Sequence, residues 1–146
     1  MVVENGKFYF IKDNFFNIFK DYNLMANKEN GNKRPCYFCF NDPENNKIIW
    51  FVPISSKVEK YKSIYESKKK VLGKERTFLI QNIFPTTEKY IENKYQNKMQ
   101  DVEITETLKQ KIIKTSMTVI SLAKKGINIP FYNIIEMKEI LLKEQN

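Results

Sequence analysis

Two short segments combine the residue types that hold a phosphate group. The first is Lys33-Arg34-Pro35, in which Arg34 is one of two arginines in a chain with 25 basic residues. An arginine side chain can donate two parallel hydrogen bonds to a phosphate, and the proline that follows restricts the backbone. The alternative is a surface arginine without a function, and composition does not decide between the two.

The second segment, Ser55-Ser56-Lys57, places two hydroxyl groups and a cation just after a predicted strand. These donors could surround a phosphate, but Ser55 or Ser56 could equally cap a helix that starts at Lys57. If the two strands between the segments form a hairpin, the start of the first strand lies beside the end of the second. We therefore expect Arg34 and Ser55-Ser56-Lys57 to lie at the same end of a sheet.

Several other kinds of catalytic site are excluded by composition. The chain has no histidine, which rules out histidine-based triads and histidine–metal sites. Cys36 and Cys39 are three residues apart in a predicted strand, so their side chains point to opposite faces and cannot share a metal ion. We expect both to be buried, reduced cysteines.

The helices and strands expected from the sequence must position the candidate site residues. Together they predict one α+β domain over residues 1–146. A small, mostly antiparallel sheet is expected early in the chain, with helices late. Thr105 is expected to cap a long helix that Gly126 ends. We expect strands at 7–11, 35–41, 47–54, 77–83 and 87–92, a short helix capped by Asp13 that ends near residue 22, and helices at 57–69, 105–126 and 130–143.

The net charge of +8 and the pI near 9.3 suggest a polyanionic partner such as a nucleic acid. The alternative is an AT-rich genome, because lysine, asparagine and isoleucine are all abundant. No apolar run approaches the roughly 18 residues of a membrane span, and residues 1–6 lack the pattern of a signal peptide. We therefore expect a cytoplasmic protein.

Residues 33–57, KRPCYFCFNDPENNKIIWFVPISSK, resemble the core of the MazF/PemK/Kid superfamily of toxin endoribonucleases. In that superfamily an Arg-Pro opens one strand and a Pro-Ile-Thr/Ser-Ser-Lys stretch ends the next. The segments GKFYFI (6–11) and FLIQNIFP (78–85) and the helical C-terminus resemble the type III toxins of the ToxN/AbiQ and CptN group. Two features depart from these patterns: the loop before Arg-Pro is NKENGNK rather than glycine-rich, and residues 66–77 are shorter than in the CptN group.

The resemblance implies a metal-independent endoribonuclease on an SH3-like barrel with added helices, working without a cofactor. Its catalytic residues would be Lys57, Ser56, Ser55 and Arg34. The resemblance also implies a small, repeat-derived, pseudoknot-like antitoxin RNA, which the toxin processes and which inhibits it. Toxin and RNA would form a closed assembly.

The chemistry suits these residue types. Cleavage of RNA without a metal uses the 2′-hydroxyl as the nucleophile and leaves a 2′,3′-cyclic phosphate and a 5′-hydroxyl. Arg34 and Lys57 can stabilise the charge of the transition state, but residue types do not assign the general acid and base. Two alternatives remain: a non-catalytic basic RNA-binding module on the same barrel, and a barrel toxin that acts on a protein such as a topoisomerase.

Basic and aromatic residues around these segments could form the RNA-binding surface. Tyr9, Tyr61 and Tyr65 could stack on bases, although filling the core explains them as well. The lysines of residues 109–114 could contact RNA or simply face solvent. The RNA-binding residues that we expect are Lys7, Tyr9, Lys33, Lys60, Lys62, Lys68, Lys69, Lys70, Lys74, Arg76, Thr86 and Thr87.

Overall fold

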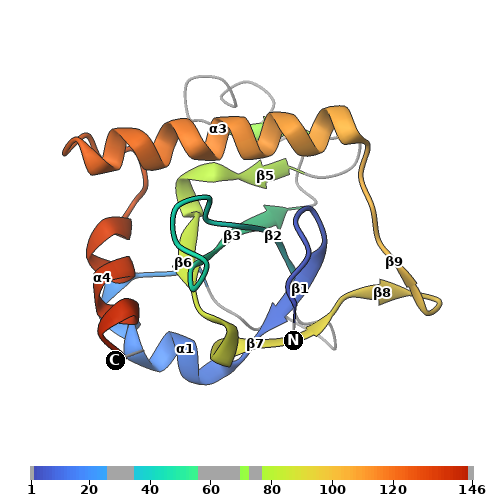
Figure 1. The fold of residues 1–146 in the computed structure, drawn as a ribbon, viewed down its shortest axis with the longest axis horizontal. Coiled ribbons are helices and arrows are strands. Elements are labelled where there is room, and N and C mark those ends of the chain that lie inside the picture. Colours follow the sequence, from blue (N-terminus) through green and yellow to red (C-terminus); the bar gives the residue numbers. More distant parts are fainter. Residues whose placement is uncertain (1, 26–34, 56–69, 73–76, 145–146) are drawn as a thin grey trace.

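A computed structural model describes residues 2–25, 35–55, 70–72 and 77–144 of the chain. Its centre is an antiparallel sheet (Figure 1). The strands are β1 (Phe8–Ile11), β2 (Tyr37–Asn41), β3 (Ile49–Ser55), β4 (Lys70–Leu72), β5 (Thr77–Leu79), β6 (Phe84–Thr86) and β7 (Ile91–Lys94). Their order is β4-β5-β3-β2-β1-β7, and β6 pairs with β3 beside this path.

The β2–β3 hairpin is the backbone of this sheet, and it confirms the hairpin predicted from the sequence. Its register runs from Tyr37 opposite Pro53 to Asn41 opposite Ile49. The outer edge of β3 has two partners, since its first residues pair with β6 and its last two pair with β5. β3 is therefore the strand that joins the two parts of the sheet.

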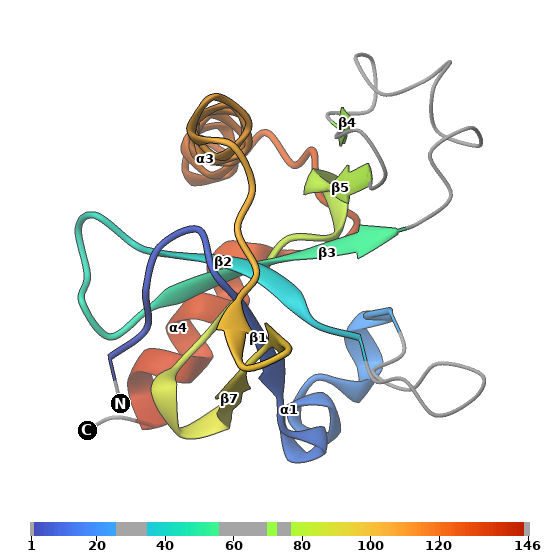
Figure 2. The ribbon, with the colours of Figure 1, turned by 90° about the vertical axis from the view of Figure 1, so that its right-hand side faces the viewer.

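Helices cover the sheet on opposite sides. α3 (Glu106–Lys124) crosses one side next to β5, and α1 (Asp13–Ile18) lies at the other (Figures 1 and 2). α4 (Ile134–Glu144) packs against β6 and α3. Short 3-10 turns follow α1, β5 and β6, and a small hairpin precedes α3. These elements are η1 (Lys20–Tyr22), η2 (Ile80–Asn82), η3 (Glu88–Tyr90), β8 (Gln96–Asn97) and β9 (Gln100–Asp101). The α+β class is thus as predicted.

The core is built largely from aromatic side chains. The buried ring of Phe15 lies 5.1 Å from the ring of Phe19 and 5.2 Å from that of Phe84. Tyr90 of η3 completes the group at 5.5 Å from Phe15. Burying each such ring stabilises the fold by about 2 kcal/mol. The cluster therefore fixes α1 against β6 and η3.

The long helix starts and ends where the sequence predicts. Thr105 is the N-cap of α3, and its Oγ1 accepts a hydrogen bond of 3.2 Å from the backbone N–H of Leu108. Gly126 follows the helix with a φ of +87°, a conformation that glycine adopts without strain. Within the described part of the chain, no helix is both long enough and apolar enough to span a membrane.

Four predicted boundaries are wrong. The helix predicted at 130–143 begins only at Ile134. Lys12, not Asp13, is the N-cap of α1, and Asp13 is its first residue. The strand predicted at 77–83 ends at Leu79, because the chain turns into η2. The strand predicted at 87–92 is replaced by η3 and the start of β7, and the strand β6 comes before it. Pro85 fits inside β6 because, among the described strands, β6 pairs with β3 alone and is therefore an edge strand. The missing N–H of proline then removes no hydrogen bond to a second neighbouring strand. The helix predicted at 57–69 lies outside the described residues.

Candidate functional site

The end of the β2–β3 hairpin near Ser55 is the candidate site. The register of Tyr37 with Pro53 places the start of β2 and the end of β3 at the same end of the hairpin. Figure 2 shows this end, where β3 finishes below β5. Ser55, the last residue of β3, is half-buried and pairs with Thr77 of β5. The structure thus describes the start of β2 and the end of β3, the two strand ends that border the predicted site.

Most of the predicted site residues lie outside the described part of the chain. Among the catalytic candidates these are Arg34, Ser56 and Lys57, so Ser55 is the one whose position the structure describes. Lys70 is placed on β4, which pairs with β5, and its backbone alone is described. The predicted RNA-binding residues outside the described ranges are Lys33, Lys60, Lys62, Lys68, Lys69, Lys74 and Arg76.

Thr77 is a residue of this site that the sequence analysis missed. Directly opposed residues of an antiparallel pair project to the same face of the sheet, so the hydroxyl groups of Thr77 and Ser55 share a face. Thr77 Oγ1 is buried and has no hydrogen-bond partner among the described residues, which is unusual for a buried hydroxyl. The signal in the sequence is a threonine at the first position of a predicted strand, which is too common a pattern to single out.

Lys7 lies in a cluster of ion pairs away from this end of the hairpin. Its Nζ contacts the Glu103 carboxylate and lies 3.6 Å from Asp101 Oδ2. The hydrogen bond with Glu103 raises the pKa of Lys7. Lys94 joins the same cluster, with its Nζ 3.0 Å from Asp101 Oδ2 and 3.2 Å from Glu4 Oε2. The charge of Lys7 is therefore already balanced by carboxylates that would repel a phosphate.

Three predicted RNA-binding residues are buried, so RNA cannot reach them in this structure. Tyr9 is 1% exposed, and its hydroxyl accepts a hydrogen bond from the backbone N–H of Glu4. Its neighbour Phe8 points to the opposite face and is buried too, so both faces of β1 are covered. The structure therefore supports the interpretation of Tyr9 as a residue of the hydrophobic core. Thr86 and Thr87 are also buried, and their hydroxyls have no hydrogen-bond partner among the described residues.

Cys36 and Cys39 are both free thiols, as expected, but they differ in burial. Cys39 is fully buried in β2, and burial raises the pKa of its thiol. Cys36 is half-buried just before β2. Cys39 therefore acts as a small core residue rather than as a nucleophile.

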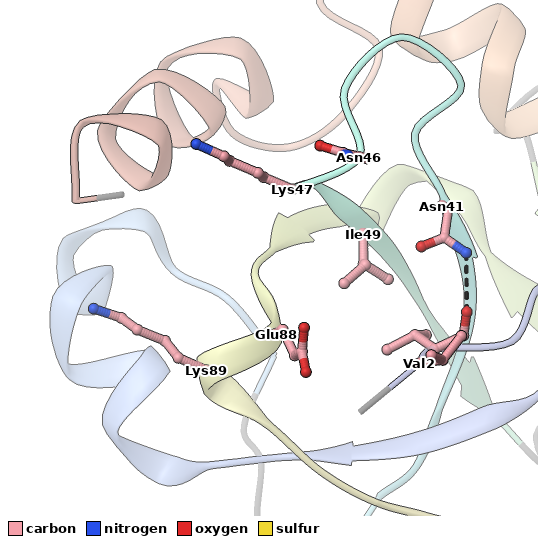
Figure 3. A pocket seen from close by; sticks show the side chains of 8 residues that line it. Val2, Asn41, Asn46, Lys47, Ile49, Glu88 and Lys89 are labelled. Atoms are coloured by element: carbon pink, nitrogen blue, oxygen red, sulfur yellow. Dashed lines mark hydrogen bonds between the residues drawn. The ribbon is translucent and has the colours of Figure 1, made fainter. Parts of the chain in front are cut away.

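A shallow hollow of about 450 Å³ lies at the other end of the hairpin, where β2 ends and β3 begins. In Figure 3 Glu88, Ile49 and Asn41 face one another across it, and the side chains of Lys47 and Lys89 extend away from it. Lys89 also pairs with Glu144 at 3.4 Å. The hollow is thus separate from the predicted catalytic residues, and its lysines do not converge on a phosphate-sized space.

No protein-family model matches the sequence, and no curated protein matches it. The resemblance to toxin endoribonucleases therefore rests on residues 33–57 and on the shorter segments given with them.

Proposed function

We propose that this protein is a metal-independent endoribonuclease toxin of the type III class, inhibited by a repeat-derived RNA. The observation that supports this most is the β2–β3 register. Arg34 directly precedes Pro35, the first described residue before β2, and Ser56 directly follows Ser55, the last residue of β3. The register puts the described neighbours of Arg34 and Ser56 at the same end of the hairpin, and the catalytic assignment requires such an arrangement.

The proposal includes an SH3-like barrel, and the strand order supports it. β1 pairs with β2 and β7, and β3 pairs with β2 and β6. Only η3 and Thr87 separate β6 from β7 along the chain. The strands β7-β1-β2-β3-β6 therefore curve around one interior (Figure 1), which is filled by large buried side chains such as Phe51 and Phe84. A strongly curved meander of this kind is what a small barrel needs.

The proposed reaction needs no group from outside the protein and the RNA. The 2′-oxygen forms a bond to the adjacent phosphorus while the bond from phosphorus to the 5′-oxygen breaks. The 2′-hydroxyl proton passes to a base, and an acid protonates the departing 5′-oxygen. Arg34 and Lys57 would stabilise the added negative charge, and Ser55 and Ser56 would position the phosphate. Thr77 shares a face with Ser55 and would support its position.

The partners follow from the same proposal. A toxin of this class cuts its own repeat-derived precursor RNA and then stays bound to the product, which blocks the site. The excess of basic residues fits a protein that is always bound to RNA. The assembly would be a closed complex of toxin and RNA.

Substitution of Lys57 tests the catalytic assignment. Lys57→Ala and Ser56→Ala should each abolish growth arrest when the toxin is expressed without its antitoxin, and should leave RNA binding largely intact because that binding spreads over many contacts. The matched control is Lys47→Ala, since Lys47 is an exposed lysine at the opposite end of the hairpin. Toxicity retained in both site variants would contradict the assignment.

A further inference from the structure

The helix α3 carries an unusual distribution of charge. After Glu106 no acidic residue occurs until Glu136, whereas five lysines occur in that interval. They are Lys109, Lys111, Lys114, Lys124 and Lys125. Elsewhere in the described chain acidic and basic residues lie close together, as in the cluster of Lys7, Lys94 and Asp101. The helix is therefore a local concentration of positive charge in a chain that otherwise mixes both signs.

The two faces of α3 have separate roles. Its inner face is buried against the rest of the protein through residues that include Ile112, Val119 and Ala123. Figure 2 shows the helix end-on, with one side toward the sheet and the other side away from it. The outward side is made of exposed residues at alternating steps of three and four, which is the spacing of one helical face. These residues are Lys111, Lys114, Thr118, Ser121 and Lys125, which we call the α3 stripe.

The stripe is polar along its whole length and carries lysines at both ends. From Lys111 to Lys125 it extends about 21 Å at 1.5 Å per residue. Two further lysines flank it, and each is held by a carboxylate: Lys109 by Glu106 at 3.4 Å and Lys124 by Glu44 at 3.2 Å. The acid at the start of the helix is itself held, since Gln110 Nε2 donates to Glu106 Oε1 at 2.8 Å. The stripe thus carries three lysines on one face of the helix, with no acidic residue of α3 among them.

We infer that the α3 stripe binds the sugar–phosphate backbone of RNA, an inference that rests on the proposed RNA-cleaving function. Lysine ammonium groups neutralise phosphates without reading bases, and the exposed Ser121 hydroxyl can donate to a phosphate oxygen. The stripe has no aromatic residue on which a base could stack. It therefore gives affinity independent of sequence, on a helix next to β5, the strand that pairs with Ser55.

The test compares two variants that lose the same charge. The stripe variant carries Lys111→Gln, Lys114→Gln and Lys125→Gln. The control variant carries Lys12→Gln, Lys20→Gln and Lys143→Gln, three exposed lysines near α1 and at the end of α4. The probe is a labelled single-stranded 2′-O-methyl RNA of mixed sequence, which lacks the nucleophile and so cannot be cut. Affinity is measured by fluorescence anisotropy over a range of KCl concentrations, after circular dichroism has shown that each variant is folded.

Loss of three phosphate contacts should reduce the slope of log affinity against log salt by about 2, or about 0.7 per contact. The control variant should keep the slope of the wild type. Equal slopes in the two variants would overturn the inference about the stripe. If the wild type also cleaves unmodified RNA in the same experiments, the proposed nuclease function stands although the stripe inference fails. Conversely, a stripe-dependent slope without any cleavage would support the stripe and contradict the nuclease. Binding of phosphatidylserine vesicles through the same lysines, without affinity for RNA, would overturn both.

Discussion

The indole Nε1–H of Trp50 donates a hydrogen bond of 2.9 Å to Asp42 Oδ2, deep in the protein. The other carboxylate oxygen of Asp42 accepts from the backbone N–H groups of Glu44 and Asn45 at 2.8 and 3.1 Å. Lys138 of α4 lies 3.6 Å from Asp42 Oδ2. One buried carboxylate thus fixes the turn of the β2–β3 hairpin to the strand and to the C-terminal helix, and with it the register of β2 against β3.

Removing this carboxylate should destabilise the fold strongly. Asp42→Ala should lower the free energy of unfolding by about 3 kcal/mol, because it leaves the buried Trp50 Nε1–H and the Lys138 ammonium without their acceptor. The measurement is urea denaturation followed by the fluorescence of Trp50, which is the sole tryptophan of the chain. The control is Glu44→Ala, which removes an exposed ion pair with Lys124 and should cost at most about 1 kcal/mol. Equal losses in the two variants would contradict the role of Asp42.

The same carboxylate should make stability depend on pH. Burial alone would raise the pKa of Asp42, but the hydrogen bonds from Trp50 and Glu44 and the charge of Lys138 outweigh it and lower the pKa below the ordinary 3.8. The unfolded chain then binds the proton more readily, so this contribution is complete above about pH 5 and is lost as the pH falls through the folded-state pKa. Urea denaturation of wild type and Asp42→Asn from about pH 6 to about pH 3 should show a smaller decrease in the variant. Parallel pH curves would be inconsistent with this prediction.

The turn between β8 and β9 should be open to stabilisation. Lys98 and Met99 have φ values of 53° and 65°, in the left-handed region that residues with a Cβ disfavour. The double substitution Lys98→Asn/Met99→Gly provides the pair preferred in two-residue hairpins and should stabilise the protein by about 1 kcal/mol. Thermal denaturation measures the change. Met99→Ala is the control, because it removes the exposed methionine side chain and keeps the Cβ. If this variant is stabilised as much as the double variant, backbone strain is not the cause.

The two thiols should react at different rates. Cys39 is fully buried and burial raises the pKa of its thiol, so a thiol reagent should not modify it in the folded protein. The clean test uses Cys36→Ser, in which Cys39 is the single thiol. Dithiobis-nitrobenzoate should leave this variant unmodified under native conditions and modify it fully in denaturant. Rapid modification of the native variant would show that Cys39 is accessible.

Local signals in the sequence predict the hairpin and the long helix well. The turn-forming residues between β2 and β3 lie between two apolar runs, and the structure places a hairpin there. Thr105 and Gly126 mark the two ends of α3 because capping and a positive φ are local requirements. The small hairpin of β8 and β9 was missed because its turn residues, Lys98 and Met99, give no turn signal.

Features that depend on tertiary packing were harder to predict. The sequence leaves Tyr9 open between stacking on a base and filling the core, and the fold decides for the core because both faces of β1 are covered. Thr86 and Thr87 look like polar surface residues, yet they are buried where β6 packs between β3 and α4. In each case the outcome depends on burial of the second face of the strand, which the periodicity of the sequence does not reveal.

The nuclease proposal is tested most directly by incubating the pure protein with mixed-sequence RNA in EDTA and determining the new termini. The expected result is a set of discrete cuts that carry 2′,3′-cyclic phosphate and 5′-hydroxyl ends, and that are absent with Lys57→Ala. The preparation is first freed of bound RNA by denaturation and refolding, so that no inhibitor is carried over. Intact RNA, bound tightly by this refolded protein and released by salt, would contradict the nuclease and leave a non-catalytic RNA-binding module.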